Sequence, residues 1–124
     1  MKVKDIMSTK VVTIDGMATV AEAAKKMKET RLHALIVDRR NEDDAYGMIS
    51  QRDIVFKVVG KGLDPNGVDV HEIMTKPCIT INPNLDVRYA ARLLAHANIN
   101  RAPVISEHRL AGMISVRDIL EKAV

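Results

Sequence analysis

Short apolar runs alternate with apolar residues at helical spacing in the first part of the chain. The β-branched run Val11–Ile14 ends at a turn signal, which predicts a short strand. From Val20 to Met27, apolar residues recur at i, i+3, i+4 and i+7, the pattern of one apolar helix face. Thr19 and Glu22 at its start match a capping box, in which each side chain satisfies a free backbone N–H. The segment therefore predicts a strand followed by a capped helix.

Two further apolar runs, at 34–37 and 46–49, are separated by a polar loop. Nearly continuous apolar runs of this length predict strands that are buried on both faces. The second run leads directly into a helix at Ser50, and this helix fades at the glycine- and proline-rich stretch 60–67. The order of elements is β-α-β-β-α.

The same order is then repeated. Val3–Met7 returns as Val70–Met74, and Gly47–Ile54 returns as Gly112–Ile119. The two copies are 67 residues apart early in the repeat and 65 apart at its end, and the acidic loop 39–44 is the predicted site of the difference. Aligning His33–Asp38 with Arg101–Ser106 requires a local spacing of 68, which predicts one more residue in the turn before that strand.

Each half of about sixty residues is marginal alone, because small units bury too little surface. We therefore expect repeats at 1–62 and 68–124, joined by a linker at 63–67, which pack together in an α/β fold of two β-α-β-β-α copies. Function is expected between the copies.

The composition is that of an ordinary soluble domain, with 47% hydrophobic and 28% charged residues. No apolar run approaches the roughly twenty residues needed to cross a bilayer, and the N-terminal residues lack the apolar core of a signal peptide. The single cysteine, Cys78, agrees with a reducing compartment, so we expect a cytoplasmic protein without membrane contact.

The net charge of +3 does not by itself indicate nucleic-acid binding. Basic and acidic residues alternate, and the three aromatic residues, Tyr46, Phe56 and Tyr89, are too few for a base-stacking platform. The four histidines are scattered, and no phosphate loop or nucleophile motif occurs. The sequence predicts a binding module that is not an enzyme.

The motif Ser-x-x-Asp occurs where the last strand of each copy becomes a helix. Ser50 and Ser115 start these helices, and a helix start offers free N–H groups and a positive dipole end to an anion. Asp53 and Asp118 lie in the first turn, where a carboxylate can accept the hydroxyls of a ribose. The alternative is that Ser-x-x-Asp is only a helix cap.

These residues resemble the cystathionine β-synthase (CBS) domain. The resemblance rests on the duplicated Val-x-[Asp/Glu]-Ile-Met opening, the threonine of the first strand, and Gly-Met-Ile-Ser-x-Arg-Asp-Ile, and it extends from Val3 to about Leu120. Two tandem copies resemble a CBS pair, or Bateman module. The resemblance implies pseudo-twofold symmetry, two clefts between the copies, and an adenosine-containing ligand such as AMP, ADP, ATP or S-adenosylmethionine in them.

The resemblance assigns candidate contacts position by position. Thr13 and Thr80, with neighbouring Val12 and Ile79, match the site that reads the adenine edge. Apolar walls for base and sugar are implied at Met48, Ile49, Met113 and Ile114, although ordinary strand core is an equal alternative.

Basic residues are implied on the phosphate side. His33 and Arg101 match a basic position before the second strand, although a lone histidine is more often a structural residue. Arg52 and Arg117 are either pocket-lining or solvated helix residues.

The leading hypothesis is a ligand sensor that binds an adenine nucleotide and modulates an unidentified protein partner or its own assembly. The alternative is a ligand-free dimerisation or scaffold module, and a nucleic-acid binder ranks last. The resemblance also implies a homodimer formed through helices.

Overall fold

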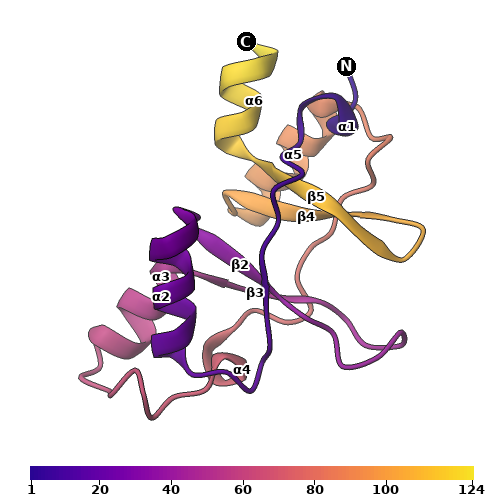
Figure 1. Ribbon diagram of the computed structural model, residues 1–124. Coiled ribbons are helices and arrows are strands. Elements are labelled where there is room, and N and C mark those ends of the chain that lie inside the picture. The colour runs from indigo at the N-terminus through magenta and orange to yellow at the C-terminus, as the bar shows by residue number, and fades with distance from the viewer. The chain divides into compact units, whose positions relative to one another are not determined.

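A computed structural model describes all residues, 1–124, and they form two compact units (Figure 1). The first-repeat unit comprises Val12–Cys78. The second-repeat unit combines Met1–Val11 with Ile79–Val124. Each unit has its own cluster of buried aliphatic side chains.

The first-repeat unit contains a three-stranded sheet with the order β1-β2-β3. Strand β1 (Thr13–Ile14) is parallel to β2 (Ala34–Val37), and β2 is antiparallel to β3 (Gly47–Ser50). The helices are α2 (Val20–Thr30), α3 (Gln51–Ile54), its π-helical continuation η1 (Val55–Val59), and α4 (Val70–Ile73). The predicted Thr19–Glu22 capping box starts α2, and all four residues of β2 are buried.

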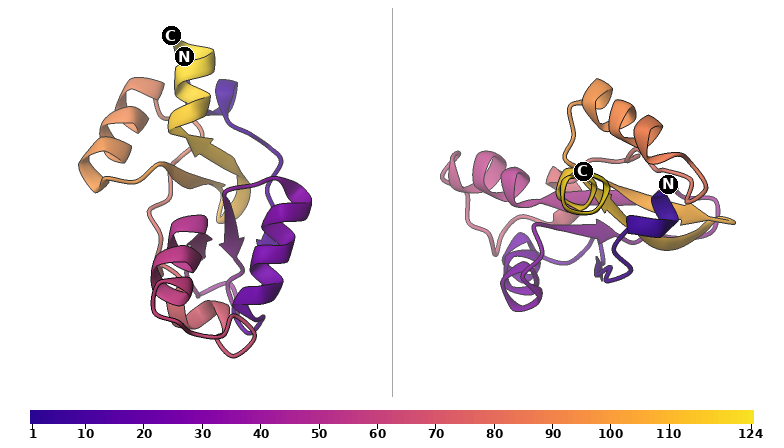
Figure 2. Two further views of the ribbon diagram at one scale, coloured as in Figure 1. Left: turned by 90° about the vertical axis from the view of Figure 1, so that its left-hand side faces the viewer. Right: turned by 90° about the horizontal axis from the view of Figure 1, so that it is seen from above.

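The second-repeat unit is built on the antiparallel pair β4 (Arg101–Ser106) and β5 (Arg109–Ser115). Its helices are α1 (Val3–Ile6), α5 (Val87–Ala97) and α6 (Val116–Ala123), and α6 continues directly from β5 (Figure 2). The segment 79–81, equivalent to the first strand of the first repeat, forms only a single parallel bridge from Ile81 to Val104. The mixed α/β architecture of two repeats is confirmed.

The opening segment of each repeat packs against the core made by the other repeat. Val3 and Ile6 of α1 are buried in the second-repeat unit, and Val70 and Ile73 of α4 are buried in the first-repeat unit. Ser8 bridges to Met113 in the same way that Thr75 bridges to Met48. Each compact unit therefore contains most of one sequence repeat together with the opening segment of the other repeat.

The predicted linker at 63–67 lies within the first-repeat unit and does not separate the two units. The carbonyl of Pro65 accepts from the Ala21 N–H at 3.0 Å, and that of Val68 accepts from Val20 N–H at 2.8 Å. The chain passes between the units at Val11/Val12 and at Cys78/Ile79.

The expected spacing of 68 before the second strand is wrong. Ile14 pairs with Val37, and Ile81 pairs with Val104, so both partners are 67 residues apart. The left-handed residues that end α2 and α5, Arg31 and Asn98, have the same spacing. The turn before the strand is therefore equally long in both repeats.

This register makes Arg101 equivalent to Ala34 and makes His33 equivalent to Asn100. The carbonyls of His33 and Asn100 accept from the first amide of the following helix, Gln51 N–H at 3.0 Å and Val116 N–H at 2.8 Å. A strand buried on both faces carries no period-two pattern, so the sequence could not reveal a slip of one residue.

The loop between β2 and β3 is anchored by Asp44. Its carboxylate accepts from Lys76 Nζ at 2.7 Å and from Arg40 Nε at 3.1 Å. The Arg40 and Lys76 hydrogen bonds hold the pKa of Asp44 well below its usual range. Because the folded pKa is lowered, the stabilisation is present above the unfolded pKa and is lost as the pH falls through the folded value.

We therefore expect Asp44→Asn to lower the denaturation midpoint at pH 7 relative to wild type. The gap should narrow as the pH falls below about 4, where the unfolded carboxyl protonates. Denaturant titrations at pH 7 and pH 3 measure this difference, with Asp43→Asn in the same loop as the control. A gap that stays constant over this range would contradict the assignment.

Candidate functional site

The Ser-x-x-Asp element of the first repeat forms a complete capping box. Ser50 ends β3, and its N–H and Oγ donate to Asp53 Oδ2 at 2.8 and 3.0 Å. The Ser50 Oγ also accepts from the Asp53 N–H at 3.2 Å. The motif therefore caps the start of α3 with both side chains.

The second repeat reproduces this geometry. The N–H and Oγ of Ser115 donate to Asp118 Oδ2 at 3.0 and 2.9 Å, and Ser115 Oγ accepts from the Asp118 N–H at 3.1 Å. The Val116 N–H is also used, by the Asn100 carbonyl. Of the first three amides of α6, only that of Arg117 remains available to an anion. The start of α6 therefore offers an anion fewer free N–H donors than the sequence predicted.

A lysine one turn after each aspartate contacts the other carboxylate oxygen. Lys57 Nζ lies 2.9 Å from Asp53 Oδ1, whereas Lys122 Nζ lies 3.8 Å from Asp118 Oδ1. Both lysines also donate to an opening helix, Lys57 to the Ile73 carbonyl and Lys122 to the Ile6 carbonyl. The sequence analysis missed this pair, although Asp-x-x-x-Lys recurs in both copies.

The two carboxylates are consequently not equally free. Their side chains keep similar exposure, 16% for Asp53 and 17% for Asp118. A carboxylate has about four acceptor positions, of which the cap uses two. The close lysine uses a third on Asp53, while the longer contact leaves Oδ1 of Asp118 more accessible to a new donor.

Arg101 begins β4 and lies directly opposite Ser115 on β5. Directly opposed residues of an antiparallel pair project from the same face with close Cβ atoms. Arg101 is partly buried, its guanidinium has no ion pair, and burial lowers its pKa. The second-repeat unit thus holds an uncompensated cation next to the Ser115–Asp118 cap.

The first-repeat unit has no cation at the equivalent position. Ala34 is the residue opposite Ser50. His33, predicted to occupy the position that matches Arg101, lies before β2, and its Nδ1 is 3.0 Å from Gln51 Oε1. The histidine therefore has a hydrogen-bond partner within its own unit.

Arg52 and Arg117 are exposed residues on the surfaces of their helices. Arg52 stacks over the Phe56 ring at 5.0 Å. Arg117 Nε lies 2.9 Å from Glu121 Oε1, and this hydrogen bond raises the pKa of Arg117. Both match the helix-surface interpretation.

The predicted base-edge residues differ between the repeats. The Thr13 carbonyl, in β1, accepts from Lys26 Nζ at 2.6 Å, and the Val12 carbonyl accepts from Ile36 N–H at 3.1 Å. Thr80 lies outside any named strand and is exposed, and Ile79 is also exposed. The backbone around Thr80 is therefore more accessible to a ligand than the backbone around Thr13.

The predicted apolar walls divide between core and surface. Ile49 and Ile114 have no exposed surface and belong to the cores, so we correct their assignment to ligand walls. Met48 and Met113 are partly exposed. Alternating side chains on β3 and β5 explain this split, because one face of each strand meets the core.

The structure assembles neither a reactive cysteine nor a metal site. The Cys78 thiol donates to the Tyr46 carbonyl at 3.3 Å, and burial raises its pKa, which disfavours the reactive thiolate. No three side chains of the metal-ligating types converge. None of the helices is long and apolar enough to traverse a bilayer.

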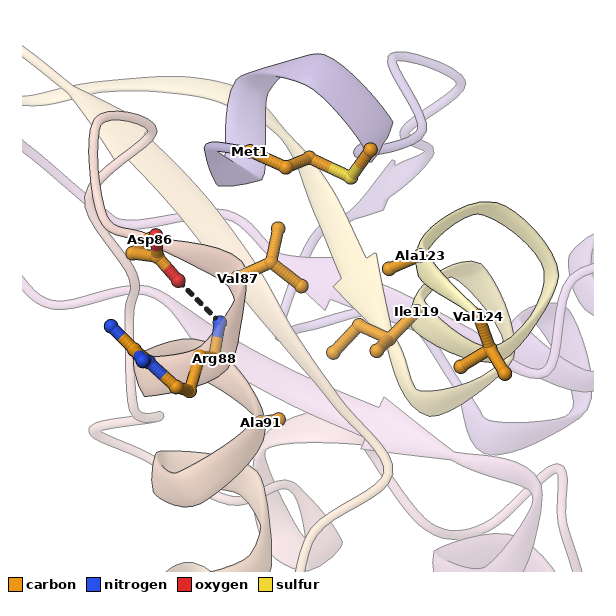
Figure 3. Close-up of a pocket in the computed structure, with 8 residues that line it drawn as sticks. All are labelled: Met1, Asp86, Val87, Arg88, Ala91, Ile119, Ala123 and Val124. Atoms are coloured by element: carbon orange, nitrogen blue, oxygen red, sulfur yellow. Dashed lines mark hydrogen bonds between the residues drawn. The ribbon is translucent and has the colours of Figure 1, made fainter.

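A shallow groove of about 360 Å³ lies between α5, α6 and the first residue of the chain (Figure 3). Its walls are mostly aliphatic, from Met1, Val87, Ala91, Ile119, Ala123 and Val124. Asp86 at its edge caps α5, accepting from the Arg88 N–H at 2.8 Å. The groove offers apolar contact but no array of polar groups for a nucleotide.

The CBS domain model matches residues 3–60 and 70–124, so the chain belongs to the CBS domain family and carries two tandem copies.

Similar proteins extend this assignment. The chain is 31% identical over 120 residues to an uncharacterised protein of Methanopyrus kandleri, covering 96% of this chain and 61% of the relative. A hexameric CBS-CP12 protein from bloom-forming cyanobacteria is 52% identical with a TM-score of 0.96, over 98% of this chain and 67% of that chain. The CBS domain pair of protein MJ0100, solved with 5′-methylthioadenosine and S-adenosyl-L-methionine, is 27% identical with a TM-score of 0.85 over the full length of both chains.

Proposed function

We propose that this CBS pair is a regulatory module that binds an adenosine-containing ligand, an adenine nucleotide or S-adenosylmethionine, and has no catalytic activity of its own. The observation that carries this proposal is Arg101, a partly buried guanidinium without a carboxylate partner, placed opposite Ser115. A desolvated cation is costly unless an anion compensates it. The complex of the similar MJ0100 pair supports the class of ligand.

The charge of each polar group in the second-repeat unit indicates which part of the ligand it would contact. Arg101 suits the phosphate or carboxylate of the ligand, because its planar fork can donate two parallel hydrogen bonds. Asp118 repels an anion but can accept ribose hydroxyls with Oδ1, which is only loosely engaged by Lys122. Thr80 and Ile79 have the more open backbone for the base edge. His33, Asp53 and Ser50 form the poorer counterpart, so we propose that the second-repeat unit makes the stronger contacts.

A ligand-free scaffold is the second candidate function, and exposed apolar residues favour it. Val55 and Val59 of η1 match Leu120 and Val124 at the end of the chain, and all four are at least half exposed. We propose that these two stripes mediate self-association as a homodimer in the cytoplasm. The similar CBS-CP12 protein is hexameric, which supports a role in self-association. A 13.7 kDa species in sedimentation at working concentration would rule this out.

Calorimetry with AMP, ADP, ATP and S-adenosylmethionine tests the ligand proposal, with Asp118→Asn as the decisive variant. The asparagine oxygen can still accept the Ser115 cap, but the second carboxylate oxygen becomes a donor and cannot accept a ribose hydroxyl. We expect at least one ligand to bind wild type, and Asp118→Asn to weaken it about tenfold or more.

Asp53→Asn makes the same change in the other repeat and should alter the affinity by less than about twofold. Equal losses in both variants would contradict the preference for the second-repeat unit. If none of the four ligands binds, the scaffold function is the remaining candidate.

A further inference from the structure

The outer face of α5 combines basic and large apolar side chains. Arg88, Tyr89, Arg92, Leu93 and His96 are all exposed. At 100° per residue they cover one continuous arc, with the arginines on one side and Tyr89 and Leu93 on the other. No acidic residue occurs within α5, and the nearest carboxylate in sequence, Asp86, is its N-cap.

The two arginines of this face have no carboxylate partner. Both stack over the Tyr89 ring, with guanidinium-to-centroid distances of 5.1 Å for Arg88 and 5.3 Å for Arg92. On other helices, Arg117 is paired with Glu121 and Lys25 with Glu29, whereas Arg52 is stacked over Phe56 without a carboxylate. Arg88 lines the edge of the groove, and Figure 3 shows its guanidinium directed away from Ile119 and Ala123, toward the outer face of α5.

The equivalent helix of the first repeat lacks this face. Tyr89 and Leu93 correspond to Glu22 and Lys26 of α2, and Arg88 corresponds to Ala21. By contrast, the apolar stripes proposed for self-association occur in both repeats. The outer face of α5 therefore occurs once in the chain and is distinct from the stripes proposed for self-association.

We propose that the outer face of α5 docks an acidic amphipathic helix of a partner protein. Arg88 and Arg92 are four residues apart and thus about 6 Å apart along the axis, which matches carboxylates at i and i+4 of a facing helix. Tyr89 and Leu93, 46% and 39% exposed, supply the apolar contact beside them. Tyrosine and arginine are also the residue types that dominate binding energy at protein interfaces. A nucleic-acid backbone would use the charges but leave the leucine side of the face unused.

Fluorescence anisotropy with stapled helical peptides tests this docking. The probe peptide carries a leucine stripe beside glutamates at i and i+4, and its matched control has glutamine in place of each glutamate. We expect the glutamate peptide to bind full-length protein at least about tenfold more tightly, and Arg88→Glu/Arg92→Glu to remove this preference. Leu93→Gln should weaken both peptides.

The matched protein control is Lys25→Glu/Lys28→Glu on α2, which changes the net charge equally and should alter peptide affinity by less than about twofold. Equal binding of the two peptides, or an equal effect of the α2 variant, would overturn the proposal. So would a single-stranded oligonucleotide that binds through the same arginines more tightly than the peptide. Sedimentation of Arg88→Glu/Arg92→Glu should match wild type, and loss of assembly would reassign the face to a second copy.

Discussion

Arg101→Ala is expected to weaken ligand binding by about 10- to 100-fold, the loss associated with removing a charge-assisted hydrogen-bonding pair. The reason is that Arg101 is the partly buried cation next to Ser115 and has no carboxylate of its own. Once it is removed, the second-repeat unit has no comparable donor for an anion. Calorimetry with the ligand that binds wild type most tightly measures the change.

Two control variants sharpen this prediction. Arg101→Lys retains the charge but loses the planar fork, so its affinity should fall between those of alanine and wild type. Arg117→Ala removes an arginine that is 77% exposed and paired with Glu121, and it should leave binding within about twofold. The assignment fails if Arg117→Ala costs as much as Arg101→Ala.

Gly112→Ala is expected to destabilise the protein by about 1–3 kcal/mol, the usual cost of overpacking. A Cβ at this position would lie 2.6 Å from the Ser8 carbonyl oxygen and 2.9 Å from Met7 Sδ. The Ser8 backbone cannot retreat easily, because Ser8 and Met113 exchange two hydrogen bonds of 2.9 Å. The substitution therefore forces the opening segment away from β5.

Gly47 provides the matched comparison in the first repeat. Its Cβ would lie 3.0 Å from Met74 Sδ, a flexible side-chain atom, and 3.2 Å from the Thr75 carbonyl. Gly47→Ala should therefore cost less than Gly112→Ala in urea denaturation. If both cost the same, or Gly112→Ala is neutral, the close packing of the opening segment is not as described.

Several features could be predicted from the sequence because local chemistry fixes them. The Thr19–Glu22 box starts α2, and the Ser-x-x-Asp boxes start α3 and α6, since capping needs only a hydroxyl and a carboxylate three residues apart. The shortening of the second loop was also predicted, and there a two-residue turn at Glu107 and His108, both with positive φ, closes the hairpin. The ligand contacts inferred from family resemblance remain predictions.

Other features depend on segments that are distant in the chain. The register of β2 and β4 is set by pairing with β1 and Ile81, and the equivalence of Arg101 with Ala34 follows from it. The lysine contacts to the carbonyls of Ile73 and Ile6 need α4 and α1 to be in place. Likewise, burial of Ile49 and Ile114 is decided by the helices that cover their strands.

The sequence by itself determined the duplicated α/β architecture, the family and the capped helix starts, because periodicity and short-range capping are local properties. Only the tertiary structure decided that the opening segment of each repeat packs in the core of the other repeat. It also decided that Arg101 lies beside the cap of the second repeat, whereas Ala34 occupies the equivalent position in the first. The physical reason is that a strand buried on both faces has the same apolar pattern in either register. Its alignment is set by hydrogen bonds to neighbouring strands, which the order of residues along the chain does not display.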